Sequence, residues 1–212
     1  AHRWDNRTMP PPLQSSPPAL VLGSTSPYRR ALLARLRMPF EVVAPQVDET
    51  PWPNEAPSAL ACRLALAKAN EVASRYPQAV VIGADQVADL NGQPVGKPGT
   101  HAKAVSQLQA MRGRDVVFHS ALAVVRPATG FARCLIANVR VHFRDLSDAD
   151  IERYLTLEQP YDCAGSAKVE TLGIALLEAI DSDDPTALEG LPLIRTCALL
   201  REAGLDPLQY AT

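Results

Sequence analysis

The stretch AVVIGADQVADLNGQPVGKP, residues 79–98, decides the fold because it joins a buried strand to a hairpin. Residues 79–84 form a short apolar run of the kind found in fully buried strands, and Asp85 follows at once. Residues 87–95 carry Asn91-Gly92 at their centre, the dipeptide most typical of a two-residue hairpin turn. The stretch therefore predicts a buried strand, an acid at its carboxyl end and a tight antiparallel hairpin.

The hairpin turn also sets a register. With a two-residue turn, Leu90 pairs with Gln93, and counting outward places Gln86 opposite Lys97. Lys97 is therefore expected to return beside Asp85. An acid at the end of a buried strand can hold a divalent cation or take a proton from water, and an ammonium can bind phosphate. The same residues also fit a structural ion pair and a loop-capping aspartate.

Strands and helices alternate on both sides of this stretch. Ser26 is a natural N-cap with Pro27 at the first helical position, and residues 147–150 read as a capping box. Long antiparallel pieces lie in the middle, so we expect an α/β fold with an elongated mixed sheet flanked by helices. The other expected strands are 19–23, 40–44, 116–125, 131–143 and 172–180, and the expected helices are 27–36, 58–75, 100–111, one from the capping box to about 157, and 192–203.

Composition excludes several classes of protein. The 212 residues are 47% hydrophobic and 21% charged, as in ordinary folded domains, and the formal net charge is −2. That balance excludes a generally basic nucleic-acid coat, and no stretch approaches the roughly 20 apolar residues that span a bilayer. We expect one domain at residues 19–212, preceded by a disordered proline-rich extension at residues 1–18.

The cysteines and histidines show no metal-binding spacing. We expect free thiols in a reducing compartment, and hence a cytoplasmic location, rather than a zinc site or a disulfide. No apolar core segment precedes Leu20, so we expect no secretory signal. A structural role is expected for His101, His119 and His142. The cysteines are Cys62, Cys134, Cys163 and Cys197.

A polar segment follows the first expected strand. Ser24 and Ser26 bring hydroxyl and backbone N–H groups to a helix N-terminus, and Arg29 and Arg30 fall in the first turn. Cations at that end oppose the helix dipole, which makes sense if a polyanion lies between them. The alternative is a capped surface helix with two solvated arginines.

Three further charged residues are candidates for the same chemistry. Asp48 and Glu49 are adjacent in a proline-broken loop and offer the oxygen ligands that magnesium and manganese prefer. In isolation, a solvated acidic turn explains them better. Lys68 lies one turn after Leu64, so its stem starts beside an apolar stripe, and its head can either reach water or bind a phosphate.

Seven separated motifs occur in one order and spacing: STSPYRR (24–30), VDET (47–50), RLALAKA (63–69), VVIGADQV (80–87), GKP (96–98), CAGSAKVE (163–170) and EGLPL (189–193). Together they resemble the Maf family over residues 20–208. The resemblance implies a nucleoside triphosphate pyrophosphatase that cleaves between the α and β phosphates. It also implies a divalent metal cation (Mg or Mn), a homodimer and the elongated fold of the inosine triphosphate pyrophosphatases.

The resemblance assigns roles to individual residues. It implies that Asp85 is the general base and that Glu49 is an active-site acid, and we expect both to contact the metal. Residues implied in substrate binding are Ser24, Ser26, Arg29, Arg30, Lys68 and Lys97.

Three positions bear on the choice of nucleotide. Members acting on dTTP and UTP usually have Arg, Thr and Gln where this chain has Tyr28, Gln86 and Glu170, a set that resembles the 7-methyl-GTP branch. A positively charged 7-methylguanine would stack well on Tyr28, and Glu170 could accept hydrogens from its amide edge. We expect hydrolysis of 7-methyl-GTP to 7-methyl-GMP and pyrophosphate, a house-cleaning role. A dTTP/UTP pyrophosphatase and a nucleotide-sensing regulator of cell division or septum formation stay open as alternatives.

Overall fold

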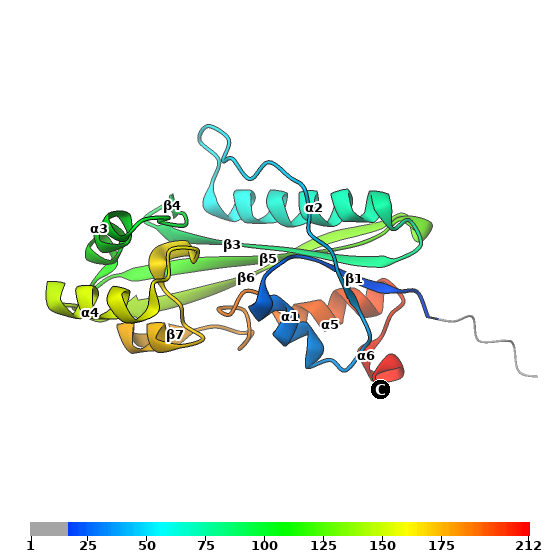
Figure 1. Ribbon diagram of the computed structural model, residues 1–212. Coiled ribbons are helices and arrows are strands. Elements are labelled where there is room, and N and C mark those ends of the chain that lie inside the picture. Colours follow the sequence, from blue (N-terminus) through cyan, green and yellow to red (C-terminus); the bar gives the residue numbers. More distant parts are fainter. Residues whose placement is uncertain (1–16) are drawn as a thin grey trace, which may run out of the picture.

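Three long strands form the spine of the molecule (Figure 1). The computed structural model describes residues 17–212, so most of the expected extension at residues 1–18 lies outside the described residues. The sheet has seven strands in the order β2-β1-β3-β5-β6-β7, and β4 pairs with β3. The strands are β1 (Leu20–Gly23), β2 (Glu41–Val42), β3 (Val80–Leu90), β4 (Gln93–Val95), β5 (Asp115–Arg126), β6 (Phe131–Phe143) and β7 (Leu177–Asp181).

The helices begin where local capping chemistry places them. Ser26 accepts a hydrogen bond from the backbone N–H of Arg29, and Ser147 and Asp150 form the predicted capping box. The α-helices are α1 (Pro27–Ala34), α2 (Pro57–Arg75), α3 (His101–Met111), α4 (Asp148–Glu158), α5 (Leu193–Glu202) and α6 (Pro207–Tyr210). Short 3₁₀ turns are η1 (Pro127–Thr129), η2 (Ala164–Ser166) and η3 (Leu172–Leu176). None of these helices has the length and apolar character that a membrane span requires.

The helices cover the two faces of the sheet unequally. Helix α2 packs on one face, against alternate residues such as Val81 of β3 and Ala121 of β5. Helices α1 and α5 pack on the opposite face around Ile82, and α3 and α4 form a separate core around Phe118 further along the strands. The mixed sheet flanked by helices is the predicted fold class. On that second face the core around Ile82 reaches Ala84 and the core around Phe118 begins at Ala88, so these two cores are separated near the middle of β3.

Strand β3 corrects one prediction about Asp85. The sequence suggested a strand that ends at residue 84, yet β3 runs without interruption to Leu90 because Asp85 and Gln86 stay paired with Ala121 and Ser120 of β5. Asp85 therefore lies inside a strand. Its special position comes from β1, whose pairing with β3 stops at Gly83.

Along that edge, β3 is paired twice and left open between the two pairings. Strand β1 pairs in parallel up to Gly83, and β4 pairs antiparallel from Ala88 onward, with the predicted partners Leu90 and Gln93. The chain after β1 and the chain after β4 therefore leave the β3 edge at the two ends of this open segment, residues 84–87. Asp85 lies within the open segment.

Two other expected elements differ from the observed ones. Strand β2 covers only Glu41–Val42 because it lies at the sheet edge, where β1 supplies its only neighbour. Residues 172–176 form the 3₁₀ turn η3, and the strand begins at Leu177, where pairing with β6 starts.

The cysteine prediction is wrong for two residues. Cys62 of α2 and Cys134 of β6 form a disulfide, with Cα atoms 6.3 Å apart, whereas Cys163 and Cys197 are free. The pair is separated by 72 positions and meets only because α2 lies across β6. No local spacing in the sequence could signal that contact.

Candidate active site

A buried ammonium holds two acids together. The Nζ atom of Lys68 lies 2.7 Å from Oδ1 of Asp85 and 2.8 Å from Oε1 of Glu49. Lys68 is only 5% exposed and Asp85 only 8%, whereas half of the Glu49 side chain is open to water. Helix α2 thus supplies Lys68, strand β3 supplies Asp85, and the loop between β2 and α2 supplies Glu49.

Helix α2 lies unusually close to β3 at this point. A Cβ atom added to Gly83 would lie 2.3 Å from the carbonyl oxygen of Ala65 and 2.5 Å from the backbone nitrogen of Ala69. Only glycine permits this approach, which sets the distance between Lys68 and Asp85.

The acids have opposite pKa shifts. Burial raises the pKa of Asp85, and the charges of Lys68 and Arg29 oppose that rise without cancelling it. Desolvation also acts on Glu49, but the hydrogen bond and charge of Lys68, with help from Lys97 and Arg29, lower its pKa. Acids whose pKa values are pushed apart are typical of catalytic pairs, and the raised pKa of Asp85 suits a proton acceptor.

The first turn of α1 places Arg29 near the same cluster, where the charges of Asp85 and Glu49 act on it. Its Nε donates to the carbonyl of Gly190 at 2.9 Å and its Nη1 to Oγ of Ser24 at 3.4 Å. Desolvation lowers the pKa of the guanidinium, while the charges of Asp85 and Glu49 act in the opposite direction. Gly190 has φ of +107°, and this conformation turns its carbonyl to Arg29.

The remaining predicted charged residues lie further from the centre. The expected pairing of Gln86 with Lys97 is wrong, because the pairing of β3 with β4 stops at Ala88 and Val95. Lys97 is exposed, and its charge acts on Glu49 rather than appearing among the main influences on Asp85. Arg30 is exposed on α1, and Asp48 is exposed and bonded to Thr50. Ser26 serves as the helix cap.

The three positions expected to select the nucleotide are Tyr28, Gln86 and Glu170, and each has its own surroundings. Tyr28 of α1 has the ammonium of Lys168 6.0 Å from its ring centre. Burial raises the pKa of Glu170, and the nearby charge of Glu189 acts in the same direction, whereas Lys168 opposes it. Gln86 donates its amide N–H groups to residues of β5 and of the loop after β7.

Sequence reasoning missed three residues of this region. Lys168 lies inside the motif CAGSAKVE, and Gly190 inside EGLPL, so each had a motif but no assigned role. Ser120 of β5 carried no local signal, because only the strand pairing opposite Gln86 brings it to the site.

The histidines are placed as side-chain hydrogen-bonding groups. His119 lies between Asp89 and Asn138, His101 between Tyr161 and Glu152, and His142 contacts Asp115. Within residues 17–212, no three His, Cys, Asp or Glu side chains gather closely enough to hold a metal ion by themselves.

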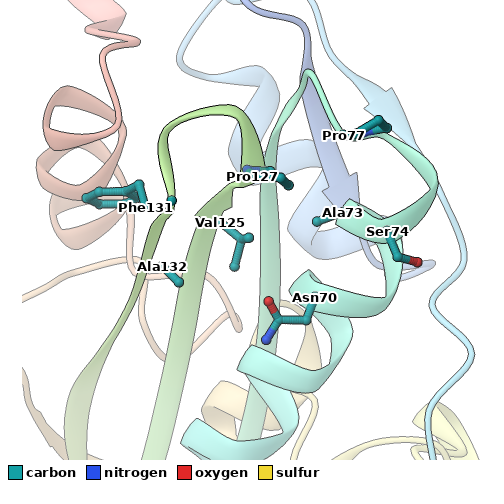
Figure 2. Close-up of a pocket in the computed structure, with 9 residues that line it drawn as sticks. Asn70, Ala73, Ser74, Pro77, Val125, Pro127, Phe131 and Ala132 are labelled. Carbon is teal, nitrogen blue, oxygen red and sulfur yellow. The ribbon is translucent and has the colours of Figure 1, made fainter.

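A separate hollow lies at the other end of α2 (Figure 2). It measures about 380 Å³ and is lined by residues such as Ala73, Val125 and Phe131, with no charged side chain among its lining residues. A triphosphate would find no cation there, so this hollow does not compete with the Lys68 cluster as the site.

Comparison with known proteins gives a consistent family. A model of the Maf-like protein family matches residues 19–203. A 7-methyl-GTP pyrophosphatase of Albidiferax ferrireducens is 64% identical over 189 residues, which are 89% of this chain and 95% of the relative. Relatives with the same name from Polaromonas sp. and Cupriavidus metallidurans are 67% and 60% identical, over 88% of this chain and 85% and 94% of their own lengths.

One solved structure is a weaker match. The Ham1 protein of Staphylococcus aureus is 16% identical and aligns with 60% of this chain and 72% of its own, with a TM-score of 0.46. At that score the likeness carries no argument here.

Proposed function

The chain belongs to the Maf-like protein family, and from that premise we propose that it hydrolyses 7-methyl-GTP to 7-methyl-GMP and pyrophosphate. The observation that carries the proposal is the buried Lys68, shared by Asp85 and Glu49 at 2.7 and 2.8 Å. Relatives of 60–67% identity bear the name 7-methyl-GTP pyrophosphatase, which supports the choice of nucleotide.

Asp85 is the proposed general base. Lys68 engages its Oδ1, and no residue in the described part of the chain hydrogen-bonds to its Oδ2. In the proposal Oδ2 accepts the proton of a water that attacks the α-phosphorus. The raised pKa of Asp85 improves its strength as a base at neutral pH.

Arg29, Lys68 and Lys97 are the proposed partners of the triphosphate. Arg29 retains its Nη2 donor after its contacts with Gly190 and Ser24, and Lys97 is exposed at the loop after β4. Positive groups fixed in advance offset the charge that develops on the departing pyrophosphate. Ser24 and Ser26 orient the loop, and Arg30 lies at its exposed rim.

A divalent metal cation, magnesium or manganese, is part of the proposal. Asp85 and Glu49 are hard oxygen donors brought to one ammonium, and magnesium is commonly held by one or two carboxylates together with substrate phosphates. The donor set therefore fits a metal that arrives with the nucleotide. Such an ion would polarise the phosphate oxygens.

The 7-methylguanine base of the nucleotide is proposed to lie near Tyr28 and Glu170. The ammonium of Lys168 lies 6.0 Å from the ring centre of Tyr28, which supports a cationic group beside this ring. Lys168 is also paired with Glu158, 3.7 Å away, so its charge has a partner other than Tyr28.

A cytoplasmic homodimer completes the proposal. The proposed nucleoside triphosphate substrate supports a cytoplasmic location. The earlier support from four free thiols no longer holds, since two of the cysteines are paired. Family membership supports the dimer, and size-exclusion chromatography with light scattering tests it.

The decisive experiment is a nucleotide panel. We expect release of pyrophosphate from 7-methyl-GTP with a kcat/KM at least about tenfold above those for GTP, dTTP and UTP. The reaction should stop with a chelator and resume with magnesium or manganese. Equal or faster turnover of dTTP would overturn the substrate assignment, and absence of pyrophosphate release from every nucleotide would overturn the reaction.

A further inference from the structure

The side-chain amide of Gln86 is fixed by its surroundings. Gln86 of β3 lies opposite Ser120 of β5, and its Nε2 donates to the Ser120 hydroxyl oxygen at 2.7 Å. The same nitrogen also donates to the carbonyl oxygens of Leu188 at 3.0 Å and Ala187 at 3.2 Å. Ser120 is completely buried, so no water replaces these contacts.

The chemistry of these partners determines which end of the amide faces them. A carbonyl oxygen can only accept, so Leu188 and Ala187 require the nitrogen of Gln86 rather than its oxygen. The Ser120 hydroxyl donates its one hydrogen to the Ala187 carbonyl at 2.6 Å, so its oxygen must accept the hydrogen bond from Gln86. Both hydrogens of the Gln86 amide are consequently in use.

The amide oxygen of Gln86 is left as a free acceptor. No residue within 17–212 donates a hydrogen bond to Oε1, and this atom is not among the buried polar atoms that lack a partner. It is therefore open to water or to a ligand on the side away from Ser120. Gln86 follows Asp85 on β3, so its side chain points to the opposite face of the strand, toward the loop after β7 whose Gly190 also contacts Arg29.

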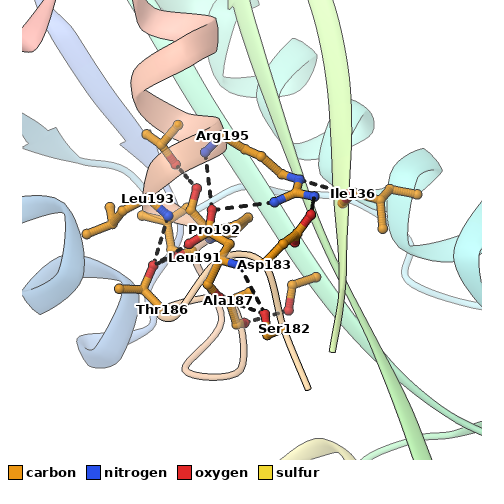
Figure 3. A network of polar contacts seen from close by, with 12 residues as sticks. Ile136, Ser182, Asp183, Thr186, Ala187, Leu191, Pro192, Leu193 and Arg195 are labelled. Carbon is orange, nitrogen blue, oxygen red and sulfur yellow. Dashed lines mark hydrogen bonds and ion pairs between the residues drawn. The ribbon is translucent and has the colours of Figure 1, made fainter. Parts of the chain in front are cut away.

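The loop that supplies the carbonyls is itself anchored (Figure 3). Asp184 is completely buried and accepts from the backbone N–H of Arg195, whose side chain donates to Ile136 of β6. The Thr186 hydroxyl donates to the Leu191 carbonyl and accepts from the backbone N–H of Leu193. These bonds hold both ends of the loop, so the acceptors of the Gln86 amide have fixed places.

We propose that Ser120 is a positioning residue that holds Gln86 with its amide oxygen toward the nucleotide. Gln86 then accepts a hydrogen bond from a donor of the substrate, either the exocyclic amine of the base or the 2′-hydroxyl of the ribose. This inference rests on the proposed function and adds to it the polarity of one recognition contact.

The test compares Ser120 variants with three substrates. Ser120→Ala removes the hydroxyl, and Ser120→Cys keeps a similar volume with a poor hydrogen-bonding group and supplies the test if the alanine variant does not fold. Thr196→Val is the matched control, because Thr196 is also fully buried and donates its hydroxyl to a carbonyl, that of Pro192. The substrates are 7-methyl-GTP, 7-methyl-ITP, which lacks the amine, and 2′-deoxy-7-methyl-GTP.

We expect both Ser120 variants to raise the KM for 7-methyl-GTP about fivefold, with kcat within about twofold of wild type, since one positioned hydrogen bond contributes about 1 kcal/mol. The wild-type preference for 7-methyl-GTP over one of the two analogues should fall by a similar factor. A fall against 7-methyl-ITP identifies the amine as the donor, and a fall against the deoxy analogue identifies the ribose. Thr196→Val should change neither KM nor the preferences.

Two results would overturn the inference. An unchanged KM in the Ser120 variants would show that the hydroxyl does not position Gln86, and a raised KM with both preferences intact would show a merely structural effect. A wild-type protein that does not act on 7-methyl-GTP is a different result, because it refutes the proposed function and the inference falls with it.

Discussion

Replacing Asp85 by asparagine separates its chemical role from its part in the fold. The substitution keeps the shape of the side chain and removes the group proposed to take the proton. General bases typically contribute 10²–10⁴-fold, so turnover of 7-methyl-GTP should fall by that factor, equivalent to about 3–5 kcal/mol in the barrier. The KM should change little, because Arg29, Lys68 and Lys97 remain.

Stability should respond in the opposite way to activity. Burial raises the pKa of Asp85, which means that the folded state disfavours its charged form at neutral pH. Lys68 keeps Glu49 as a partner at 2.8 Å in the variant, so its ammonium is not left alone. The free energy of unfolding should therefore stay within about 1 kcal/mol of wild type or rise above it.

Steady-state pyrophosphate release and urea unfolding measure the two effects. Asp89→Asn is the control, because Asp89 lies on the same face of β3 four residues further along, roughly 13 Å away at strand spacing. It should keep near wild-type turnover. The assignment of the base is wrong if Asp85→Asn retains more than about a tenth of wild-type activity, and the electrostatic reasoning is wrong if the variant loses several kcal/mol of stability.

Three other predictions follow from the same contacts. Lys68→Met leaves Asp85 facing Glu49 without an ammonium, so the pKa of Asp85 should rise further. Because activity is lost as pH falls through that pKa, the acidic limb of the kcat/KM profile should move to higher pH. The free energy of unfolding in urea should fall by about 3 kcal/mol. An acidic limb that stays at the same pH would show that Lys68 does not control the pKa of Asp85. Gly83→Ala should force α2 away from β3 and cost about 3 kcal/mol with loss of turnover, whereas Gly96→Ala, with open space at its Cβ, should be nearly neutral by thermal unfolding. Reduction of the disulfide should lower the free energy of unfolding by up to about 4 kcal/mol, from closure of a 72-residue loop, and a Cys62→Ser/Cys134→Ser variant should no longer respond to reductant; equal urea midpoints with and without reductant would contradict this.

Local chemistry made much of the fold predictable. The N-cap at Ser26, the capping box at Ser147 and the Asn91-Gly92 turn each act through neighbours within four positions, and all three are observed. The predicted strand before Asp85 was too short, because the sequence does not reveal that β5 pairs with β3 well beyond this point. That pairing is a long-range contact with no local periodicity of its own.

The candidate site divides in the same way. Family motifs led to the residues of the Lys68 cluster, whereas the hairpin register extended too far when it placed Lys97 opposite Gln86, because the observed pairing stops at Ala88 and Val95. The sequence could not show that Lys68 is buried rather than reaching into water, since that depends on the close approach of α2 at Gly83. Ser120 and the disulfide were hidden for the same reason, because each arises from a contact between elements far apart in the chain.

The uninterrupted spine has a consequence for how the protein accommodates a ligand. Strands β3, β5 and β6 are 11, 12 and 13 residues long, and β5 pairs with both neighbours without a register shift while passing from one hydrophobic core to the other. Such a ribbon offers no hinge between the two lobes. The distance between Lys68 and the α3–α4 core is therefore set by the strands, and we expect it to stay the same when a nucleotide binds.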